Sequence, residues 1–153
     1  MQNQIIERRV DHSALKVNQA LIIALLLLAF ILDNWLLAAF VGVVMLLGTA
    51  APGLSLFKVV YSRLLRPAGI VKPRLVVDNP EPHRFAQGLG GFFVALAVGA
   101  LLVGQPFLGW ALVWVVIILA AMNLFLGFCA GCFIYYQLSR LGLPGFTRRP
   151  IVN

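Results

Sequence analysis

A charge-free run of 55 residues, from Phe85 to Ser139, limits the folds open to this chain more than any other feature. As one helix at about 1.5 Å per residue it would be roughly 80 Å long, more than twice the hydrocarbon thickness of a bilayer, about 30 Å. The run must therefore reverse direction. The chain is also 61% hydrophobic and only 11% charged, against about 25% charged residues in soluble domains. These features indicate a membrane protein with several spans.

The apolar segments predict helices rather than strands. Two of them, ALIIALLLLAFIL and WALVWVVIILAAM, lack the alternating polarity that the strands of a membrane barrel show. A helix also satisfies its backbone hydrogen bonds within one segment, as lipid requires. Breaks at Asp33-Asn34, Pro52-Gly53 and Gly104-Gln105-Pro106 separate the segments. We therefore expect an all-α integral membrane protein with four transmembrane helices, over about residues 17–32, 35–51, 85–103 and 108–136.

The two halves of the chain follow one plan. Each begins with Val-Asp, in VDHSALKVNQAL and VDNPEPHRFAQGL, and each places a glutamine near the start of a span. We predict that the halves are two parallel-repeat hairpins with the same orientation; the alternative is the general likeness of any two membrane hairpins. The single membrane domain, 1–153, then divides into a first hairpin, a cytoplasmic basic loop, a second hairpin and a cytoplasmic tail, at residues 10–57, 58–84, 85–140 and 141–153.

The basic residues predict an orientation. All twelve lysines and arginines lie outside the two predicted hairpin turns, so the positive-inside rule puts both termini and the loop 58–84 in the cytoplasm. No small-residue cleavage site precedes the second span, and we read the first span as a retained anchor. The net charge of +7 suits contact with the anionic headgroups of a lipid bilayer. Because no basic and aromatic groove is present outside the apolar segments, we expect no nucleic-acid partner.

Small residues recur every four positions on the last two spans. Faces of this kind let helix backbones approach closely in lipid, so we predict helix contacts along both stripes. We expect Asn123, inside the fourth span, to form a hydrogen bond across its contact; a ligand contact is the alternative. The stripes consist of Gly91, Ala95 and Gly99 on the third span and Asn123, Gly127 and Gly131 on the fourth.

Both cysteines of the chain, Cys129 and Cys132, stand in a C-x-x-C spacing near the end of the fourth span. On a continuous helix their side chains point about 60° apart, and a disulfide between them would need local distortion. Cytoplasmic thiols are also held reduced, which argues against a permanent disulfide. Three interpretations remain: packing as small apolar residues, thiol chemistry, and metal binding. A metal would need further ligands from His12, His83 or the cysteines of a second protomer.

Polar side chains gather at the span ends on the predicted side of the thiols. We predict that Asp11 and Asp78 cap the helices that follow them. An arginine beside a thiol favours the thiolate, and Arg84 is the candidate. No phosphate loop or Ser-His-Asp arrangement is present, and we expect no cofactor. The polar set consists of Asp11, Asn18, Gln19, Asp78, His83, Arg84 and Gln87.

Three segments, VDHSALKVNQA, NPEPHRFAQ and LGFCAGCFIYYQL, resemble a bacterial group of small membrane proteins, the domain-of-unknown-function family numbered 4395. The resemblance extends over about residues 10–141. The sequence departs from the pattern of the family by Asn79, inserted after Asp78, and by His12, where a proline is common. The matching residues are Asp11, Asn18, Gln19, Asp78, Pro80, Pro82, Arg84, Phe85, Gly127, Phe128, Cys129, Gly131 and Cys132.

The resemblance implies a multi-pass protein of the bacterial cytoplasmic (inner) membrane. Members of this family occur beside thioredoxin-like and sulfurtransferase proteins in some bacteria, which implies thiol redox chemistry or sulfur relay with such a partner. Cys129 and Cys132 are then the catalytic candidates. The alternative is a non-catalytic accessory or assembly subunit that packs against a larger membrane complex. The sequence leaves open whether the protein is an enzyme.

Overall fold

Helices make up most of the chain in the computed structural model, which describes residues 9–51, 55–78 and 80–144. The predicted break at Pro52-Gly53 and the end of the tail, 145–153, lie outside the described residues. The elements in chain order are β1 (Arg9–Asp11), α1 (His12–Ile31), α2 (Trp35–Ala50), α3 (Leu56–Val60), the π-helical segment η2 (Tyr61–Leu65), β2 (Leu75–Val77), α4 (Pro80–Leu102), α5 (Pro106–Ala121), the π-helical segment η3 (Met122–Leu126) and α6 (Ala130–Arg140).

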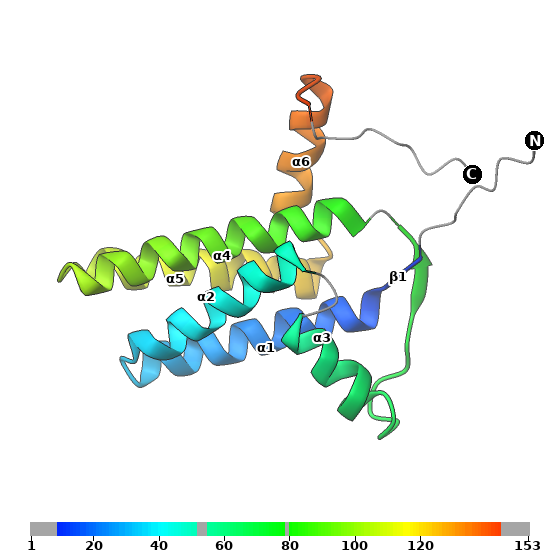
Figure 1. Ribbon diagram of the computed structural model, residues 1–153, viewed down its shortest axis with the longest axis horizontal. Helices are drawn as coiled ribbons and strands as arrows, with labels where there is room; N and C mark the ends of the chain where they lie inside the picture. Colours follow the sequence, from blue (N-terminus) through cyan, green and yellow to red (C-terminus); the bar gives the residue numbers. More distant parts are fainter. Residues whose placement is uncertain (1–8, 52–54, 79, 145–153) are drawn as a thin grey trace, which may run out of the picture.

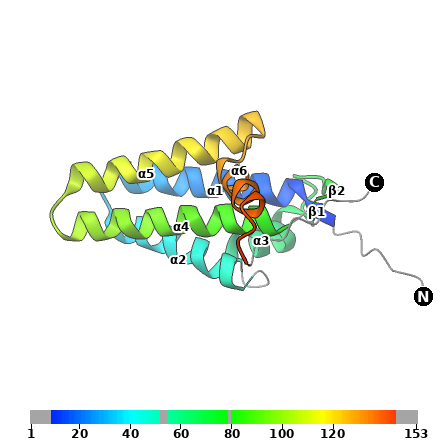
Figure 2. The same cartoon turned by 90° about the horizontal axis from the view of Figure 1, so that it is seen from above.

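Four of these helices, α1, α2, α4 and α5, lie side by side as a bundle (Figures 1 and 2). Three helices are long and apolar enough to cross a membrane: His12–Ile31, Glu81–Leu102 and Pro106–Leu126. These helices indicate a lipid environment, because their outward side chains are apolar and their backbones are satisfied internally. The remaining bundle helix, Trp35–Ala50, is apolar but shorter.

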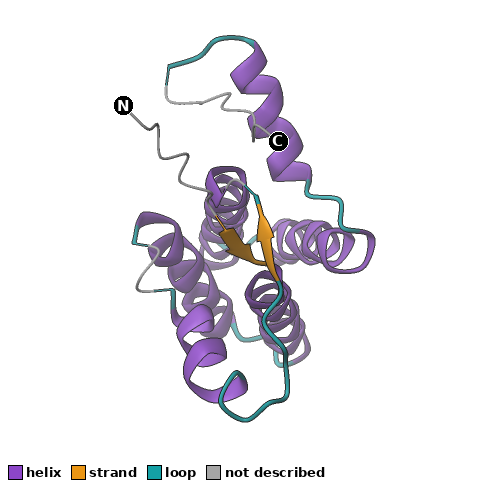
Figure 3. Ribbon diagram, turned by 90° about the vertical axis from the view of Figure 1, so that its right-hand side faces the viewer, coloured by secondary structure: helices purple, strands orange, loops and turns teal. Residues whose placement is uncertain are grey.

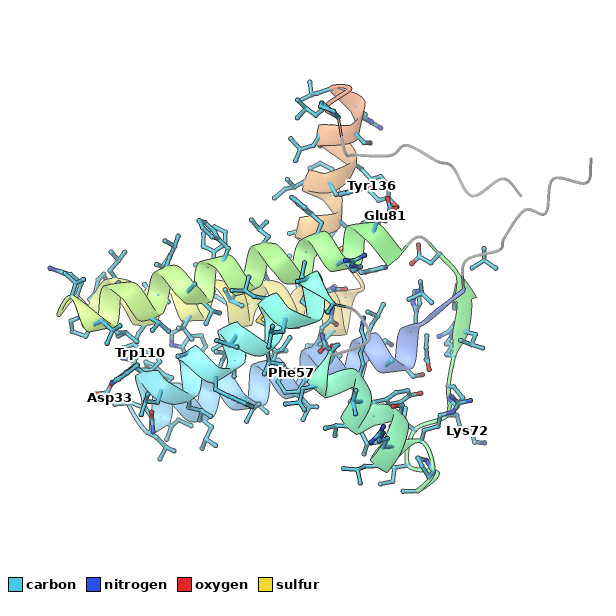
Figure 4. All side chains as sticks on the ribbon, in the orientation of Figure 1. Asp33, Phe57, Lys72, Glu81, Trp110 and Tyr136 are labelled. Carbon is cyan, nitrogen blue, oxygen red and sulfur yellow. A yellow bond between two sulfur atoms is a disulfide. The ribbon has the colours of Figure 1, made fainter. Side chains whose placement is uncertain are left out.

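The core of the bundle lies where α2 packs along α4, the most extensive contact between elements. Val41 of α2 and Val94 of α4 are fully buried, as is Val113 of the neighbouring α5. Gly42 lets α4 approach, since a Cβ on it would lie 3.0 Å from Cγ1 of Val94. Phe57, from α3, also inserts its ring against the core (Figure 4). Small and β-branched residues therefore bring these helices close together, as lipid leaves little hydrophobic force between helices.

The predicted small-residue stripes are correct only in part. Gly91 is buried against Leu46 of α2, and a Cβ on Gly131 would lie 2.5 Å from that of Ala86. A Cβ on Gly99 or Gly127 would meet nothing within 4 Å among the described residues, and Ala95 is exposed. The stripes do not continue because Ala95 and Gly99 lie on the exposed side of α4, whereas Val94 and Ala97 are the buried residues of this part of the helix. On the last predicted span, the helix ends before Gly127.

The fourth predicted span, 108–136, is wrong at its end. The α5 helix passes into η3 and stops at Leu126, where Gly127 takes a left-handed conformation with φ 68°. The chain then starts a separate helix, α6, which projects away from the bundle in Figure 1 and is seen end-on in Figure 2. Only glycine adopts this conformation without a steric penalty. The apolar run therefore contains two helices after its turn, not one.

Contacts at the two ends of the bundle hold the halves together. At one end β1 pairs antiparallel with β2, with Arg9 opposite Val77; Figure 3 looks at this end, with the strands in front of the helices. At the other end Nε1 of Trp110 donates to Oδ1 of Asp33 at 2.9 Å (Figure 4). The all-α prediction is thus wrong in one detail. Three-residue strands were not predicted, and they join the starts of α1 and α4.

The segment 58–84, predicted as a basic loop, carries more structure than expected. It contains most of α3, all of η2 and β2, and the first turn of α4. The third long helix accordingly begins near Pro80 rather than at Phe85. Proline suits the first turn of a helix, because its missing N–H has no partner there anyway. This earlier start places His83 on a helix.

Candidate functional site

A disulfide joins Cys129 to Cys132 at the start of α6. Cys129 is the residue before the helix, and its Sγ accepts a hydrogen bond from the backbone N–H of Cys132 at 3.2 Å. The expected obstacle to a disulfide, a continuous helix, is absent because the turn at Gly127 ends the preceding helix. The local distortion that a disulfide was expected to need is thus present in the fold. Cys132 is buried, 9% exposed, whereas Cys129 is half-buried.

His83 is an ionisable side chain beside the disulfide. Its Nδ1 lies 3.6 Å from Sγ of Cys132, and its Nε2 lies 3.0 Å from Oδ2 of Asp78. The same carboxylate oxygen lies 3.2 Å from Nε2 of His12. Because Nε2 of His83 donates to a carboxylate, the neutral ring has Nδ1 as an acceptor that faces Cys132. A sulfur, an imidazole, a carboxylate and a second imidazole thus form one chain.

The two short strands bring this chain of groups together. Asp78 follows β2, and the pairing of β2 with β1 sets it beside His12, the first residue of α1. His83 reaches the same carboxylate from the first turns of α4. The backbone N–H of His12 donates to the carbonyl of Arg74 at 2.9 Å, which extends the strand pairing by one residue. The sheet is therefore the part of the fold that positions the histidines.

The capping prediction is confirmed for Asp11. Its Oδ1 accepts from the backbone N–H groups of Ser13 and Ala14, at 2.9 and 3.3 Å, which satisfies two donors at the start of α1. Its other oxygen accepts from the hydroxyl of Tyr61 at 3.0 Å. Oδ2 of Asp78 lies within hydrogen-bond distance of both histidines, so this carboxylate belongs to the candidate site.

Side chains of α6 fix the disulfide over His83. The hydroxyl of Tyr135 donates to Oε2 of Glu81 at 2.9 Å, and its ring packs on Phe85 with centroids 5.7 Å apart. Gly131 lies against Ala86 of α4. Burial first, then the charge of Asp78 and the neighbouring Tyr135, raise the pKa of Tyr136; Figure 4 shows this residue on α6 near the start of α4.

The prediction that Arg84 lies near the thiols is wrong. Its Nη2 donates to the carbonyl of Thr49 at 2.7 Å, at the carboxyl end of α2. Its positive charge interacts favourably there with the negative end of the α2 dipole. Neighbouring residues on a helix point about 100° apart, so His83 and Arg84 face different partners. The side of α4 on which α6 packs determines that His83, and not Arg84, contacts the disulfide.

A cavity of about 110 Å³ lies beside the disulfide, between α1, α4, α5 and the start of α6. Four members of the predicted polar set line it, namely Asn18, Gln19, His83 and Gln87. Asn123 and Cys129 line the same cavity, and most of the remaining lining is apolar. Asn18 is buried, and its Oδ1 has no hydrogen-bond partner among the described residues. The convergence of these residues on one space was not predicted, since it depends on how three helices pack.

Among the residues that the structure describes, two overlapping groups of side chains could hold a metal ion. One consists of His83, Cys129 and Cys132, and the other of His12, Asp78 and His83; within each group the ligand atoms lie within 4.8 Å of one another. The first group needs both sulfurs as thiolates, so it could bind only after the disulfide is reduced. The second has the two imidazoles and one carboxylate that suit several transition metals. His83 takes part in both.

The fold and the site define a small helical membrane protein with a disulfide at one end of its bundle. Residues 10–140 match the family described as domain of unknown function, DUF4395, and the chain belongs to that family. The resemblance in the three segments of sequence is thereby confirmed. No curated protein and no solved structure matches the chain.

Proposed function

We propose that this protein is a membrane thiol–disulfide oxidoreductase that accepts electrons from a thiol partner through Cys129 and Cys132. One observation carries the proposal. The disulfide lies at the start of a helix, and its buried sulfur lies 3.6 Å from an imidazole that is itself bonded to a carboxylate. Directional thiol exchange requires two sulfurs that differ in exposure, so that a partner attacks only one of them. It also requires an acid or base beside the other sulfur.

The reaction begins at Cys129, the more exposed sulfur. A thiolate of the partner attacks Sγ of Cys129, the S–S bond breaks, and Cys132 leaves with the electron pair. His83 lies where it can give this sulfur a proton. The second thiol of the partner then attacks its own sulfur in the mixed disulfide and releases Cys129. The partner becomes a disulfide, and this protein gains two electrons and two protons.

The start of α6 also favours Cys129 in the reverse direction. In the reduced protein its thiolate would face the positive end of an 11-residue helix and accept the N–H of Cys132. Both interactions stabilise the thiolate, which is the nucleophilic form. His83 would in turn take the proton of Cys132 when that thiol resolves a mixed disulfide. Cys129 is thus the exchanging sulfur and Cys132 the resolving one.

The proposed partner is a thioredoxin-like or sulfurtransferase protein. With a sulfurtransferase, the reduced Cys129 would carry a persulfide and relay sulfur instead of electrons. The bonded state of the two sulfurs favours the redox version, because a persulfide relay does not need the second cysteine as a disulfide partner.

We further propose that all four bundle helices cross the bacterial inner membrane, as two hairpins of the same orientation. Both α1 and α4 begin at the end of the bundle where β1 pairs with β2. If α1 crosses, the chain must return before α4 begins, and α2 is the helix that takes this path. At 16 residues it is about 24 Å long, which a locally thinner bilayer accommodates. Positive charge places both termini in the cytoplasm.

One observation favours the alternative function, an accessory subunit of a larger membrane complex. The outward face of α6 exposes Phe133, Ile134 and Leu141, which are 54%, 41% and 76% exposed. Such a face suits a membrane surface or a partner subunit. Purification with mild detergent separates the two: a stable, stoichiometric complex with large membrane subunits supports this alternative.

The test of the proposed function is disulfide trapping with a matched pair of variants. In Cys132→Ser the exchanging Cys129 remains without its resolving cysteine. The probe is a thioredoxin-like protein whose own resolving cysteine is replaced by serine and whose remaining thiol is activated with thionitrobenzoate. Neither protein can then resolve the product, and a mixed disulfide should accumulate. In Cys129→Ser the remaining thiol is buried, and we expect little product. A membrane-impermeant maleimide should also label the reduced protein in inverted vesicles, and mild oxidation should remove the labelling reversibly. Failure of both thiols to react, with only a loss of stability when both become alanine, would overturn the proposal.

A further inference from the structure

We propose that the cavity beside the disulfide binds the ring of a lipid-soluble quinone, which takes up the two electrons of the reduced Cys129–Cys132 pair. This inference rests on the proposed thiol–disulfide activity, since it names the acceptor for the same two sulfurs. A membrane quinone is the final acceptor in one bacterial system that oxidises protein dithiols.

The place of the cavity favours a flat ring that arrives from the lipid. Its volume is about 110 Å³, less than the apolar cavity of about 150 Å³ that holds one benzene molecule in another protein. It would therefore hold the reacting edge of a quinone ring, while the substituted side and the tail stay in the lipid. Residues of three helices that are long enough to span a membrane form its walls, among them Ile22, Phe93 and Val116. A water-soluble metabolite would have to enter between these apolar walls. A lipid-soluble ligand reaches them directly.

The charge of the lining favours a neutral ligand. No Lys, Arg, Asp or Glu is among the described residues that line the cavity, and His83 is the one residue among them that can carry positive charge. A phosphate or carboxylate group would therefore lose its hydration without gaining a permanent positive partner. The ring of a quinone is uncharged in both its oxidised and its fully reduced forms, and so suits this lining.

The amide side chains suit a ligand whose polar groups change from acceptor to donor. A quinone has carbonyl oxygens that accept hydrogen bonds, and a hydroquinone has hydroxyl groups that donate them. An amide can serve both, through its NH₂ group and its oxygen. Asn18 is 4% exposed with Oδ1 unpartnered among the described residues, and Gln19 and Asn123 lie on the same cavity. Buried polar groups without partners are uncommon and indicate an unfilled role.

The cavity also reaches the redox pair, because Cys129 and His83 line it. In the proposed step the thiolate of Cys129 adds to the quinone ring and forms a C–S bond. His83 takes the proton of Cys132, whose thiolate then attacks Sγ of Cys129. The S–S bond forms as the C–S bond breaks, and the electron pair leaves with the ring. With two protons the ring departs as hydroquinone, so that two thiols and one quinone give one disulfide and one hydroquinone.

The test uses the purified full chain in lipid nanodiscs with a decyl-substituted benzoquinone as the probe. The protein is first reduced with dithiothreitol, freed of it, and mixed with the probe; loss of quinone absorbance and loss of thiols are followed together. We expect one quinone to be consumed per cysteine pair. No quinone-dependent loss of thiols would overturn the proposal.

Two variants on one helix locate the reaction. Ala120 lines the cavity and Ala111 is exposed on the outer side of α5. Ala120→Leu should fill the space and slow quinone reduction at least tenfold, whereas Ala111→Leu should react as the wild type does. Asn18→Ala serves as a second cavity variant should Ala120→Leu not assemble, and it should raise the probe concentration needed for half-maximal rate. Equal rates in all four proteins would overturn the cavity as the site.

Failure of this inference is distinguishable from failure of the proposed function. Equilibrium binding of the probe to the Cys129→Ser, Cys132→Ser double variant measures the cavity without any redox step, and mixed-disulfide trapping measures thiol exchange without any quinone. If trapping succeeds and the double variant does not bind the probe, the proposed oxidoreductase activity is supported and the quinone site is ruled out. If the double variant binds the probe and trapping fails, the quinone site is supported and exchange with a thiol partner is ruled out.

Discussion

His83 is the residue of the candidate site that we expect to exchange a proton with the buried sulfur of Cys132. It contacts Cys132 through one ring nitrogen and Asp78 through the other, while His12 contacts the carboxylate alone. His83→Asn should therefore slow resolution of a mixed disulfide at Cys129 by about 10²-fold, the usual size of general acid–base catalysis. The measurement is the rate at which a partner linked to Cys129 is released from protein that retains Cys132.

His12→Asn is the matched control, because it removes an imidazole from the same carboxylate without touching sulfur. We expect a much smaller change in this variant. Equal losses in the two variants would mean that the histidines only stabilise the fold.

Tyr61 carries a second prediction at the level of a single residue. It is buried in η2, and burial, followed by the hydrogen bond and charge of Asp11, raises its pKa. The folded state then holds the phenol proton more tightly than the unfolded chain does. This contribution to the free energy of unfolding is complete below about pH 10, the ordinary pKa of tyrosine, and it decreases as the pH rises further.

Tyr61→Phe should lose roughly 1 kcal/mol at neutral pH with the lost hydrogen bond. Its melting temperature in detergent should then decrease less between pH 9 and 11 than that of the wild type. Tyr136→Phe is the comparison, since the pKa of Tyr136 is also raised but its side chain is 47% exposed, and we expect a smaller effect. An unchanged slope above pH 10 in Tyr61→Phe would contradict the argument.

At the level of elements, the turn between η3 and α6 determines whether the two sulfurs can meet. Gly127→Ala should cost about 1–2 kcal/mol, because an L-residue is strained at φ 68°. In the reduced protein the turn can relax toward a continuing helix, whereas the disulfide holds it. The variant should therefore shift the pair toward the reduced state in glutathione buffers of fixed composition.

Gly104→Ala provides a control with the same kind of backbone strain, at φ 83° in the turn between α4 and α5. It should lower thermal stability about as much as Gly127→Ala but leave the fraction of oxidised protein unchanged. An equal redox shift in both variants would mean that general destabilisation, rather than the turn beside Cys129, sets the state of the pair.

The same turn explains why parts of this fold could be predicted from sequence and others could not. The three long helices and the turns at Asp33 and Gly104 could, because a charge-free run in lipid has few solutions. The break at Gly127 could not, since glycine is frequent within membrane helices and apolar residues continue on both sides. The deciding factor is tertiary, the packing of Gly131 of α6 on α4.

The candidate site divides in a similar way. The C-x-x-C spacing and the polar residues around it are visible in the sequence. Their partners are not: His83 rather than Arg84 meets the sulfur, because adjacent side chains on a helix diverge. The pairing of Asp78 with both histidines depends on two strands of three residues each, too short to give an alternating pattern. The cavity depends on the spacing of three helices.

For the whole molecule, the arrangement of the four bundle helices makes a prediction about topology. Asp33 and Trp110 form a hydrogen bond across the two hairpin turns, so both turns lie at one end of the bundle. The strands and Lys72 lie at the other end (Figure 4). If the bundle crosses the membrane with positive charge inside, the turns face the periplasm and the segment between α2 and α4 faces the cytoplasm.

Single cysteines in a Cys129→Ser, Cys132→Ser background can test this arrangement with a membrane-impermeant maleimide. Asn34→Cys and Gln105→Cys, in the two exposed turns, should label in intact spheroplasts, and the exposed Ser62→Cys should label only in inverted vesicles. Reporter fusions at residues 34, 70, 105 and 153 should agree, with alkaline phosphatase active only at 34 and 105.

Two other outcomes would contradict this topology. If α2 does not cross the membrane, the residues before and after it lie on the same side, and Asn34→Cys and Ser62→Cys will both label from that side. If all three positions label from the sides opposite to those expected, the orientation is reversed. In that case the Cys129–Cys132 pair would face the periplasm, where disulfides persist, and a cytoplasmic thiol partner would be ruled out.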